Sequence, residues 1–136
     1  MQKLASILLI DDDLTNNFLN ELLLQRLEVA DQVLTAESGE AALELLARPG
    51  AVEPALILLD VNMPGLTGLE FLEQYQRQRE AQTQASVVVM LTTTMDAKDL
   101  ARINELHIDG LVSKPLTEEK VNQLLQLHFQ RSLPVR

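Results

Sequence analysis

The sequence contains no cysteine and no tryptophan, and only 3% of its 136 residues are aromatic. Without cysteine the protein has no disulfide, no thiolate nucleophile and no cysteine-ligated zinc, so it needs no oxidising compartment and we expect a cytoplasmic location. Because aromatic residues are few while 46% of residues are hydrophobic, the core must consist mainly of Leu, Ile, Val and Ala. This composition favours helices layered on a sheet over a β-sandwich.

Positive charge is also scarce, because 11 Lys and Arg residues stand against 20 Asp and Glu residues and the formal net charge is −9. Such a surface repels phosphate backbones, so nucleic acid is not an expected partner. The apolar run that ends at Ile10 is too short for a signal peptide or a membrane span. We expect one domain over residues 1–136, with its core at about 4–129 and no output domain.

Five short apolar runs have the length and continuity of buried strands, and the segments between them have the three- and four-residue apolar spacing of helices. The expected strands are Ser6–Ile10, Gln32–Ala36, Ala55–Leu59, Val87–Leu91 and Gly110–Ser113. The expected helices are Leu14 to about Glu28, a run after Ser38 that holds Ala41 and Leu45, Leu69–Arg79, Ala97–Leu106 and Thr117–Phe129. Because crossover connections are right-handed, this alternation predicts an α/β fold, a doubly wound five-stranded parallel sheet with five helices.

The helix starts carry capping residues, since Asp13 and Ser38 have side-chain oxygens that can accept hydrogen bonds from the first turns. The first expected helix also has a regular apolar spacing, which predicts an amphipathic helix. Its apolar residues are Leu14, Phe18, Leu22, Leu23 and Leu27.

Polar residues follow four of the five expected strands. In open α/β sheets, ligands bind beyond the carboxyl ends of the strands. Each residue alone has an ordinary explanation: an aspartate can cap a helix, a threonine can end a strand, and a lysine before proline can lie on the surface. Their convergence on one edge of the sheet favours a shared site. The residues are Asp11, Asp12, Asp60, Thr92 and Lys114.

These residue types suit phosphoryl transfer. Three close carboxylates repel one another, and Mg²⁺, which prefers oxygen ligands, relieves that repulsion and accepts phosphate oxygens. One carboxylate can then attack a phosphoryl group to form an acyl phosphate. A lysine ammonium, a threonine hydroxyl and backbone N–H groups can neutralise the transferred charge.

Four motifs resemble those of CheY-like receiver domains of response regulators, over about Leu4 to Phe129. The spacings agree with that family, with 32 residues from Asp60 to Thr92 and 22 from Thr92 to Lys114. The resemblance implies a flavodoxin-like strand order, 2-1-3-4-5. The motifs are Ile10-Asp11-Asp12-Asp13, Leu58-Leu59-Asp60-Val61-Asn62-Met63-Pro64 with Gly68, Leu91-Thr92-Thr93 and Ser113-Lys114-Pro115.

By this resemblance Asp60 is the phospho-acceptor. Asp12 binds Mg²⁺ directly, Asp11 assists partly through water, and Asn62 offers its backbone carbonyl. These assignments imply Mg²⁺ as the cofactor.

The resemblance also assigns residues to the phosphoryl group. Thr92 donates its hydroxyl, Thr93 its backbone N–H and Lys114 its ammonium. Asn62 and Thr94 lie where receivers tune the lifetime of the phosphate.

Two further positions bear on the family comparison. Pro115 matches a proline whose preceding peptide bond is usually cis. Leu111 stands where receivers often carry a Tyr or Phe that turns inward on switching, and we expect it to be a core leucine.

The resemblance implies a signalling module and not an enzyme. A histidine kinase or a histidine phosphotransfer protein phosphorylates Asp60, and the face of the fourth helix, fifth strand and fifth helix then changes its affinity for a partner protein. The runs at 12–18 and 116–120 also resemble free-standing bacterial receivers, which agrees with a domain that works through partners.

Three other functions compete with this interpretation. A haloacid-dehalogenase-like phosphatase would carry Asp-x-Asp-x-Thr, whereas Val61 and Asn62 follow Asp60. A flavin- or nucleotide-binding protein would need a glycine-rich loop after the first strand, where three aspartates stand instead. A phosphorylation-independent adaptor would not need the full set of site residues.

Overall fold

The computed structural model describes residues 3–48, 50, 53–60, 68–78, 87–92 and 108–130. Five parallel strands form one sheet in the order β2-β1-β3-β4-β5, so the predicted α/β fold and strand order are confirmed. Four helices are described, and the further helix expected at 97–106 lies outside the described residues. The elements are β1 Leu4–Ile10, α1 Leu14–Arg26, β2 Ala30–Ala36, α2 Gly39–Ala47, β3 Leu56–Asp60, α3 Gly68–Gln78, β4 Val87–Thr92, β5 Gly110–Ser113 and α5 Glu118–Phe129.

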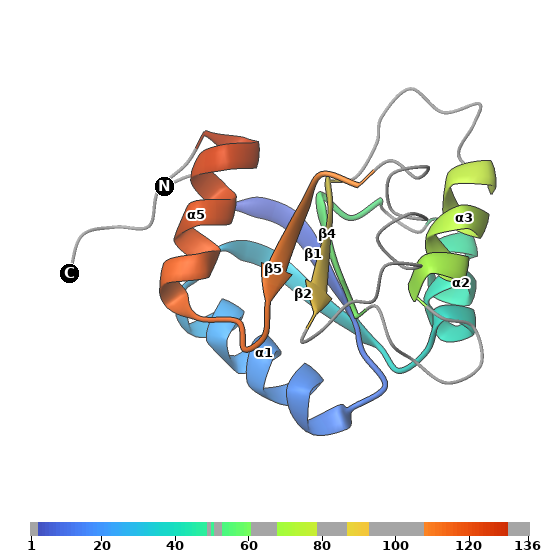
Figure 1. The fold of residues 1–136 in the computed structure, drawn as a ribbon, viewed down its shortest axis with the longest axis horizontal. Helices are drawn as coiled ribbons and strands as arrows, with labels where there is room; N and C mark the ends of the chain where they lie inside the picture. Colours follow the sequence, from blue (N-terminus) through green and yellow to red (C-terminus); the bar gives the residue numbers. More distant parts are fainter. Residues whose placement is uncertain are drawn as a thin grey trace.

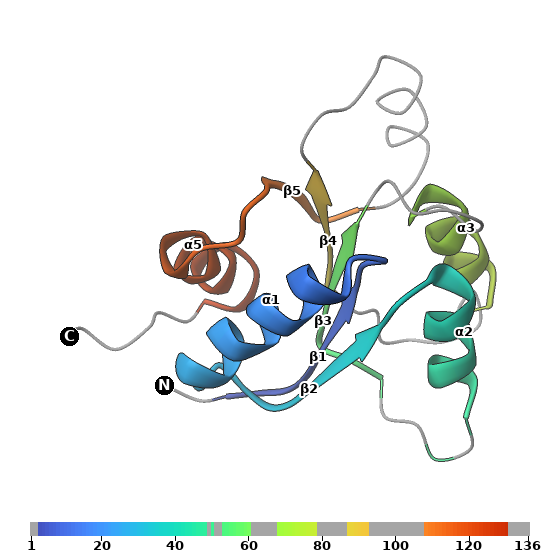
Figure 2. The same ribbon diagram turned by 90° about the horizontal axis from the view of Figure 1, so that it is seen from below.

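Helices cover both faces of the sheet, with α1 and α5 on one side and α2 and α3 on the other (Figures 1 and 2). Side chains of a strand alternate between the faces, so β1 contributes to two cores. Leu8 and Ile10 join the cluster under α2 and α3, which includes Phe71. Ile7 and Leu9 join the cluster under α1 and α5. This double coverage explains why the strands have near-continuous apolar sequences.

The central strand β3 is buried at every residue from Leu56 to Asp60, with β1 on one side and β4 on the other. Full burial of each leucine or isoleucine side chain contributes about 1.5–3 kcal/mol. Asp60 is the last residue of this strand, and the apolar strand before it fixes the position of its backbone. No helix in the described ranges is both long and apolar enough to cross a membrane.

The helices begin at side-chain caps. The carboxylate of Asp13 accepts hydrogen bonds from two N–H groups in the first turn of α1, at 2.9 and 3.2 Å. Ser38 and Thr117 each accept one in the same way at α2 and α5, at 3.0 and 3.2 Å. Each cap of this kind typically contributes about 1 kcal/mol. The capping roles predicted for Asp13 and Ser38 are therefore confirmed.

The apolar spacing of α1 does not identify its buried face. Leu14, Phe18 and Leu22 are 60%, 59% and 46% exposed, whereas Asn17 and Leu24 are buried. Residues seven apart lie on the same side of a helix, so Asn17 and Leu24 define the side toward the sheet. Leu23 and Leu27 of the predicted pattern do pack on the core. The pattern therefore predicted the helix, but it did not separate the buried from the exposed side, because α1 carries apolar residues on both.

Candidate functional site

The structure brings three carboxylates together at the carboxyl edge of the sheet. Asp11 and Asp12 follow β1, and Asp60 ends the neighbouring strand β3. Each offers one oxygen atom, and the three atoms lie within 4.8 Å of one another. Asp11 and Asp60 are only 3% and 5% exposed, while Asp12 is exposed to solvent. The fold therefore holds two buried negative charges beside an accessible third.

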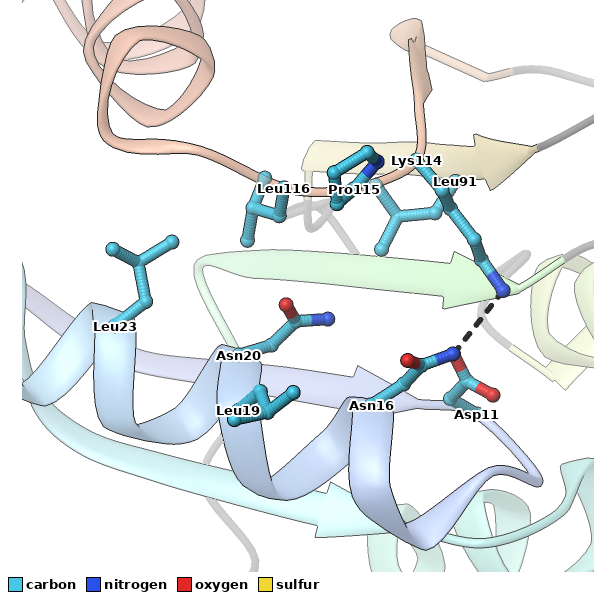
Figure 3. Close-up of a pocket in the computed structure, with 9 residues that line it drawn as sticks. All are labelled: Asp11, Asn16, Leu19, Asn20, Leu23, Leu91, Lys114, Pro115 and Leu116. Atoms are coloured by element: carbon cyan, nitrogen blue, oxygen red, sulfur yellow. Dashed lines mark hydrogen bonds and ion pairs between the residues drawn. The ribbon is translucent and has the colours of Figure 1, made fainter.

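Lys114, directly after β5, contacts this carboxylate cluster with its ammonium group. Its Nζ lies 3.1 Å from Oδ1 of Asp60 and 3.3 Å from Oδ2 of Asp11, and Figure 3 shows the contact with Asp11. Partial burial of the ammonium by itself lowers the pKa of Lys114, but the hydrogen bonds and negative charges of Asp60 and Asp11 outweigh it and raise the pKa above its ordinary value. Lys114 is thus held in its charged form next to the carboxylates.

A buried amide fixes the backbone under the carboxylates. The Nδ2 of Asn17 in α1 donates to the carbonyls of Asp11, at 2.9 Å, and Ala36, at 3.1 Å. The N–H of Asp11 donates to the same Ala36 carbonyl at 3.1 Å, and the N–H of Asp13 donates to Oδ1 of Asp11 at 2.9 Å. These bonds tie α1 and the ends of β1 and β2 together, which positions the aspartate pair.

A second set of bonds holds the segment that carries Lys114. The N–H of Lys114 donates to the carbonyl of Thr92 at 2.9 Å. From α5, the Nζ of Lys120 donates to the carbonyls of Ser113, at 2.7 Å, and Pro115, at 2.9 Å, and to the hydroxyl of Ser113 at 3.3 Å. The Lys114–Pro115 peptide bond is cis. The backbone on both sides of Lys114 is therefore anchored to neighbouring elements.

The remaining site residues named from the sequence fall into two groups. Thr92 ends β4, is half-buried and pairs with Ser113 of β5, so it lies on the same edge as the carboxylates. Asn62, Thr93 and Thr94 lie outside the described residues.

Leu111 corrects one expectation. We expected a core leucine, but its side chain is 46% exposed. The reason is its place in β5, an edge strand where exposure alternates: Val112 packs on the core under α1 and α5, while Leu111 and Ser113 belong to the opposite face.

Beside the carboxylates, a cavity of about 500 Å³ opens between α1 and the segment after β5 (Figure 3). Asp11 and Lys114 line one end, with Asn16 and Asn20 of α1 nearby. The rest of the wall is apolar and consists of Leu19, Leu23, Leu91, Pro115 and Leu116. The cavity thus borders the acidic cluster at Asp11 and has a largely apolar wall.

A strand-end aspartate cluster paired with a lysine after the fifth parallel strand is the arrangement that the motifs indicated. The family model of the response regulator receiver domain matches residues 7–126. The chain belongs to this family. The receiver domain is a signalling domain, and the chain is a receiver of two-component signalling.

Known relatives agree with this assignment. A two-component response regulator from Cytophaga hutchinsonii has a similar structure, with a TM-score of 0.79 and 32% identity over 96% of this chain and all of that one. For the chemotaxis protein CheY4 of Vibrio cholerae the TM-score is 0.76, with 27% identity over 91% and 98% of the two chains. A probable methanogenesis regulatory protein, FilR2 of Methanothrix harundinacea, is 30% identical over 88% of this receiver and 78% of its own length.

Two residues that shape the site escaped the sequence reasoning. Asn17 reads as one polar residue among several in α1, and Lys120 reads as an ordinary charge in the first turns of α5. Neither carries a sequence signal, because their main partners are backbone carbonyls outside their own helices. The buried side of α1 and the fold of the segment after β5 had to be known first.

Proposed function

We propose that Asp60 accepts a phosphoryl group in a Mg²⁺-dependent reaction, and that residues 1–136 act as a single cytoplasmic receiver which switches its binding to a partner protein. The observation that carries the proposal is the ion pair of Lys114 with Asp60, at 3.1 Å between Nζ and Oδ1, inside the three-carboxylate cluster. An ammonium at this distance is suited to a phosphoryl oxygen on the same carboxylate.

The donor set of the cluster fits Mg²⁺. Among the described residues it offers three carboxylates, and one of them, that of Asp12, is open to solvent, so bound water can complete the shell of a small hard cation. We assign Asp11, Asp12 and Asp60 as the residues that hold the ion, with the backbone carbonyl of Asn62 as a further ligand. When bound, Mg²⁺ offsets the charge of the phosphoryl oxygens and the carboxylates.

The reaction itself transfers one phosphoryl group. A carboxylate oxygen of Asp60 forms a bond to phosphorus, and the bond from phosphorus to the donor's imidazole nitrogen, or to the acetate oxygen of acetyl phosphate, breaks with its electron pair on the leaving group. Lys114 pairs with the phosphoryl oxygens in place of its contact with Asp60. The Thr92 hydroxyl and the Thr93 N–H donate to the same oxygens, and Asn62 and Thr94 control water access.

The exposed apolar face of α1 supports a docking surface for the phosphoryl donor. We name Leu14, Phe18, Leu19 and Leu22 the α1 stripe; their side chains are 46–60% exposed. The stripe begins two residues after Asp12, and Leu19 also lines the cavity that Asp11 and Lys114 border. A histidine kinase or histidine phosphotransfer protein must bring its phosphohistidine to Asp60, so contact with this adjacent face is expected.

The downstream partner is proposed to bind the face of β5 and α5 together with the helix expected from the sequence at 97–106. Leu111 supports this assignment, because an exposed leucine on the edge strand β5 offers apolar area to a partner. Phosphorylation shifts the equilibrium between two conformations of this face, and the protein need not turn over any outside substrate.

The test compares wild-type protein with Asp60→Asn. Each is incubated with Mg²⁺ and acetyl phosphate, and intact-protein mass spectrometry measures the phosphoryl adduct. We expect one adduct on the wild type and none on Asp60→Asn, while Asp31→Asn, which changes an exposed carboxylate of β2, behaves like the wild type. A wild-type protein that gains no adduct and binds no beryllofluoride refutes the proposal and favours a phosphorylation-independent adaptor.

A further inference from the structure

Lys120 of α5 forms hydrogen bonds to the residues on both sides of Lys114. Its single ammonium donates to three acceptors, two on Ser113 at the end of β5, at 2.7 and 3.3 Å, and one on Pro115 just after it, at 2.9 Å. Two of these acceptors are the backbone carbonyls of Ser113 and Pro115, the residues immediately before and after Lys114. All three bonds carry a charged donor, and such bonds are shorter and stronger than neutral ones.

The three bonds act on the residue between them. The Ser113 carbonyl belongs to the same peptide unit as the Lys114 N–H, and that N–H is itself fixed by the Thr92 carbonyl at 2.9 Å. The Pro115 carbonyl fixes the chain on the other side. The Ser113–Lys114 peptide unit is thus anchored directly, and on the other side the chain is held one residue further on, at the Pro115 carbonyl. The Cα of Lys114 therefore has little freedom, and its side chain extends toward Asp60 from a defined position.

We infer that Lys120 is a positioning residue for phosphoryl transfer, a clamp that sets the backbone of Lys114 so that its ammonium meets the phosphoryl oxygens at Asp60. The inference rests on the proposed function of Asp60. It adds a residue that touches none of the reacting atoms and acts through Lys114. Small displacements of a charged group next to a reacting centre cost large factors in rate, so loss of the clamp reduces the rate of phosphorylation.

The experiment measures the initial rate of acyl phosphate formation from acetyl phosphate at saturating Mg²⁺, well below each variant's melting temperature. Lys120→Met removes the ammonium and keeps the aliphatic stem, and we expect the rate to fall about tenfold. Lys120→Arg keeps a charged donor and should recover most of the wild-type rate. Arg48→Met, which removes one exposed positive charge at the end of α2, is the matched control and should keep the full rate.

A double-mutant cycle separates positioning from a purely structural role. If Lys120 acts through Lys114, then Lys120→Met causes no further loss when Lys114 is already Met. The Mg²⁺ dissociation constant, measured by calorimetric titration, should stay within about twofold of the wild type in Lys120→Met, because the three carboxylates are untouched.

Three outcomes would overturn the proposed role of Lys120. A full rate in Lys120→Met overturns the clamp, and so does an equal further loss in the Lys114→Met background. Loss of stability without loss of rate also overturns it. Failure of the proposed function looks different, because then the wild type itself forms no acyl phosphate.

Discussion

At the scale of single residues, the site combines four charged side chains. Asp11, Asp12 and Asp60 carry three negative charges, and the ammonium of Lys114 offsets one of them. Two of the carboxylates are buried, where opposite charges interact more strongly than in water. The remaining excess of negative charge attracts a cation to the cluster. It repels an anion that binds without a cation.

Asn17 gives a prediction at this scale. Asn17→Leu keeps the approximate volume and leaves the carbonyls of Asp11 and Ala36 without the amide donor. We expect the free energy of unfolding to fall by about 1–3 kcal/mol, the usual cost of unsatisfied buried polar groups, as measured by urea denaturation. Gln25→Leu, an exposed amide on the same helix, should change it by less than about 0.5 kcal/mol.

The decrease in the free energy of unfolding in Asn17→Leu should be smaller than the summed contribution of two hydrogen bonds. Within the described part of the chain the Oδ1 of Asn17 is itself buried with no hydrogen-bond partner, so leucine removes one unsatisfied atom. The Ala36 carbonyl also keeps the Asp11 N–H as a donor. A variant as stable as the wild type would show that water replaces the amide and that Asn17 does not hold the edge of the sheet.

At the scale of elements, the two sides of α1 differ in their surroundings. Its inner side supplies Leu24 to the core and Asn17 to the sheet edge. Its outer side carries the α1 stripe, whose apolar area contributes little to folding because it remains in water. An apolar face that does not stabilise the monomer is expected to contact a partner.

The α1 stripe yields a prediction that separates docking from chemistry. Phe18→Ser should lower the rate of phosphorylation by a phosphorylated histidine phosphotransfer protein that acts on the wild type by about tenfold or more, in the range of interface hot spots. Its rate with acetyl phosphate should be unchanged, since that donor needs no docking surface. Both rates are measured by quenched-flow detection of the acyl phosphate.

Leu127→Ser is the matched control for this experiment, because Leu127 of α5 is 77% exposed and lies outside the stripe. It should behave like the wild type with both donors. Equal rates for Phe18→Ser and wild type with the protein donor would show that the donor approaches Asp60 by another face.

At the scale of the whole molecule, the site joins segments that are distant in sequence. Asp11 and Lys114 are 103 residues apart and lie in contact only in the folded chain. The carboxylates of Asp11 and Asp60 likewise come together only on folding, so a cation that they share binds the folded state. Ligands that bind only the folded state stabilise it. The proposed Mg²⁺ site therefore predicts that Mg²⁺ stabilises the folded chain.

The corresponding prediction concerns stability with and without the metal. At a Mg²⁺ concentration of 100 times its dissociation constant, the free energy of unfolding should rise by about 2.7 kcal/mol relative to protein in chelator. Asp12→Asn should remove most of this increase, and Asp31→Asn should retain it. Chemical denaturation at matched ionic strength measures both, and a wild type that is equally stable in Mg²⁺ and in chelator contradicts the metal site.

The sequence determined the strands, the caps at Asp13 and Ser38, and the strand-end residues that face one edge, because these follow from local periodicity and from the geometry of parallel sheets. The buried side of α1, the exposure of Leu111 and the anchoring bonds of Asn17 and Lys120 were decided by the tertiary structure alone. The reason is physical: α1 has apolar residues on both sides, and β5 lies at an edge. Asn17 bonds to the Ala36 carbonyl, 19 residues away, and Lys120 bonds to Ser113 and Pro115 across a turn whose shape depends on how α5 packs on the sheet.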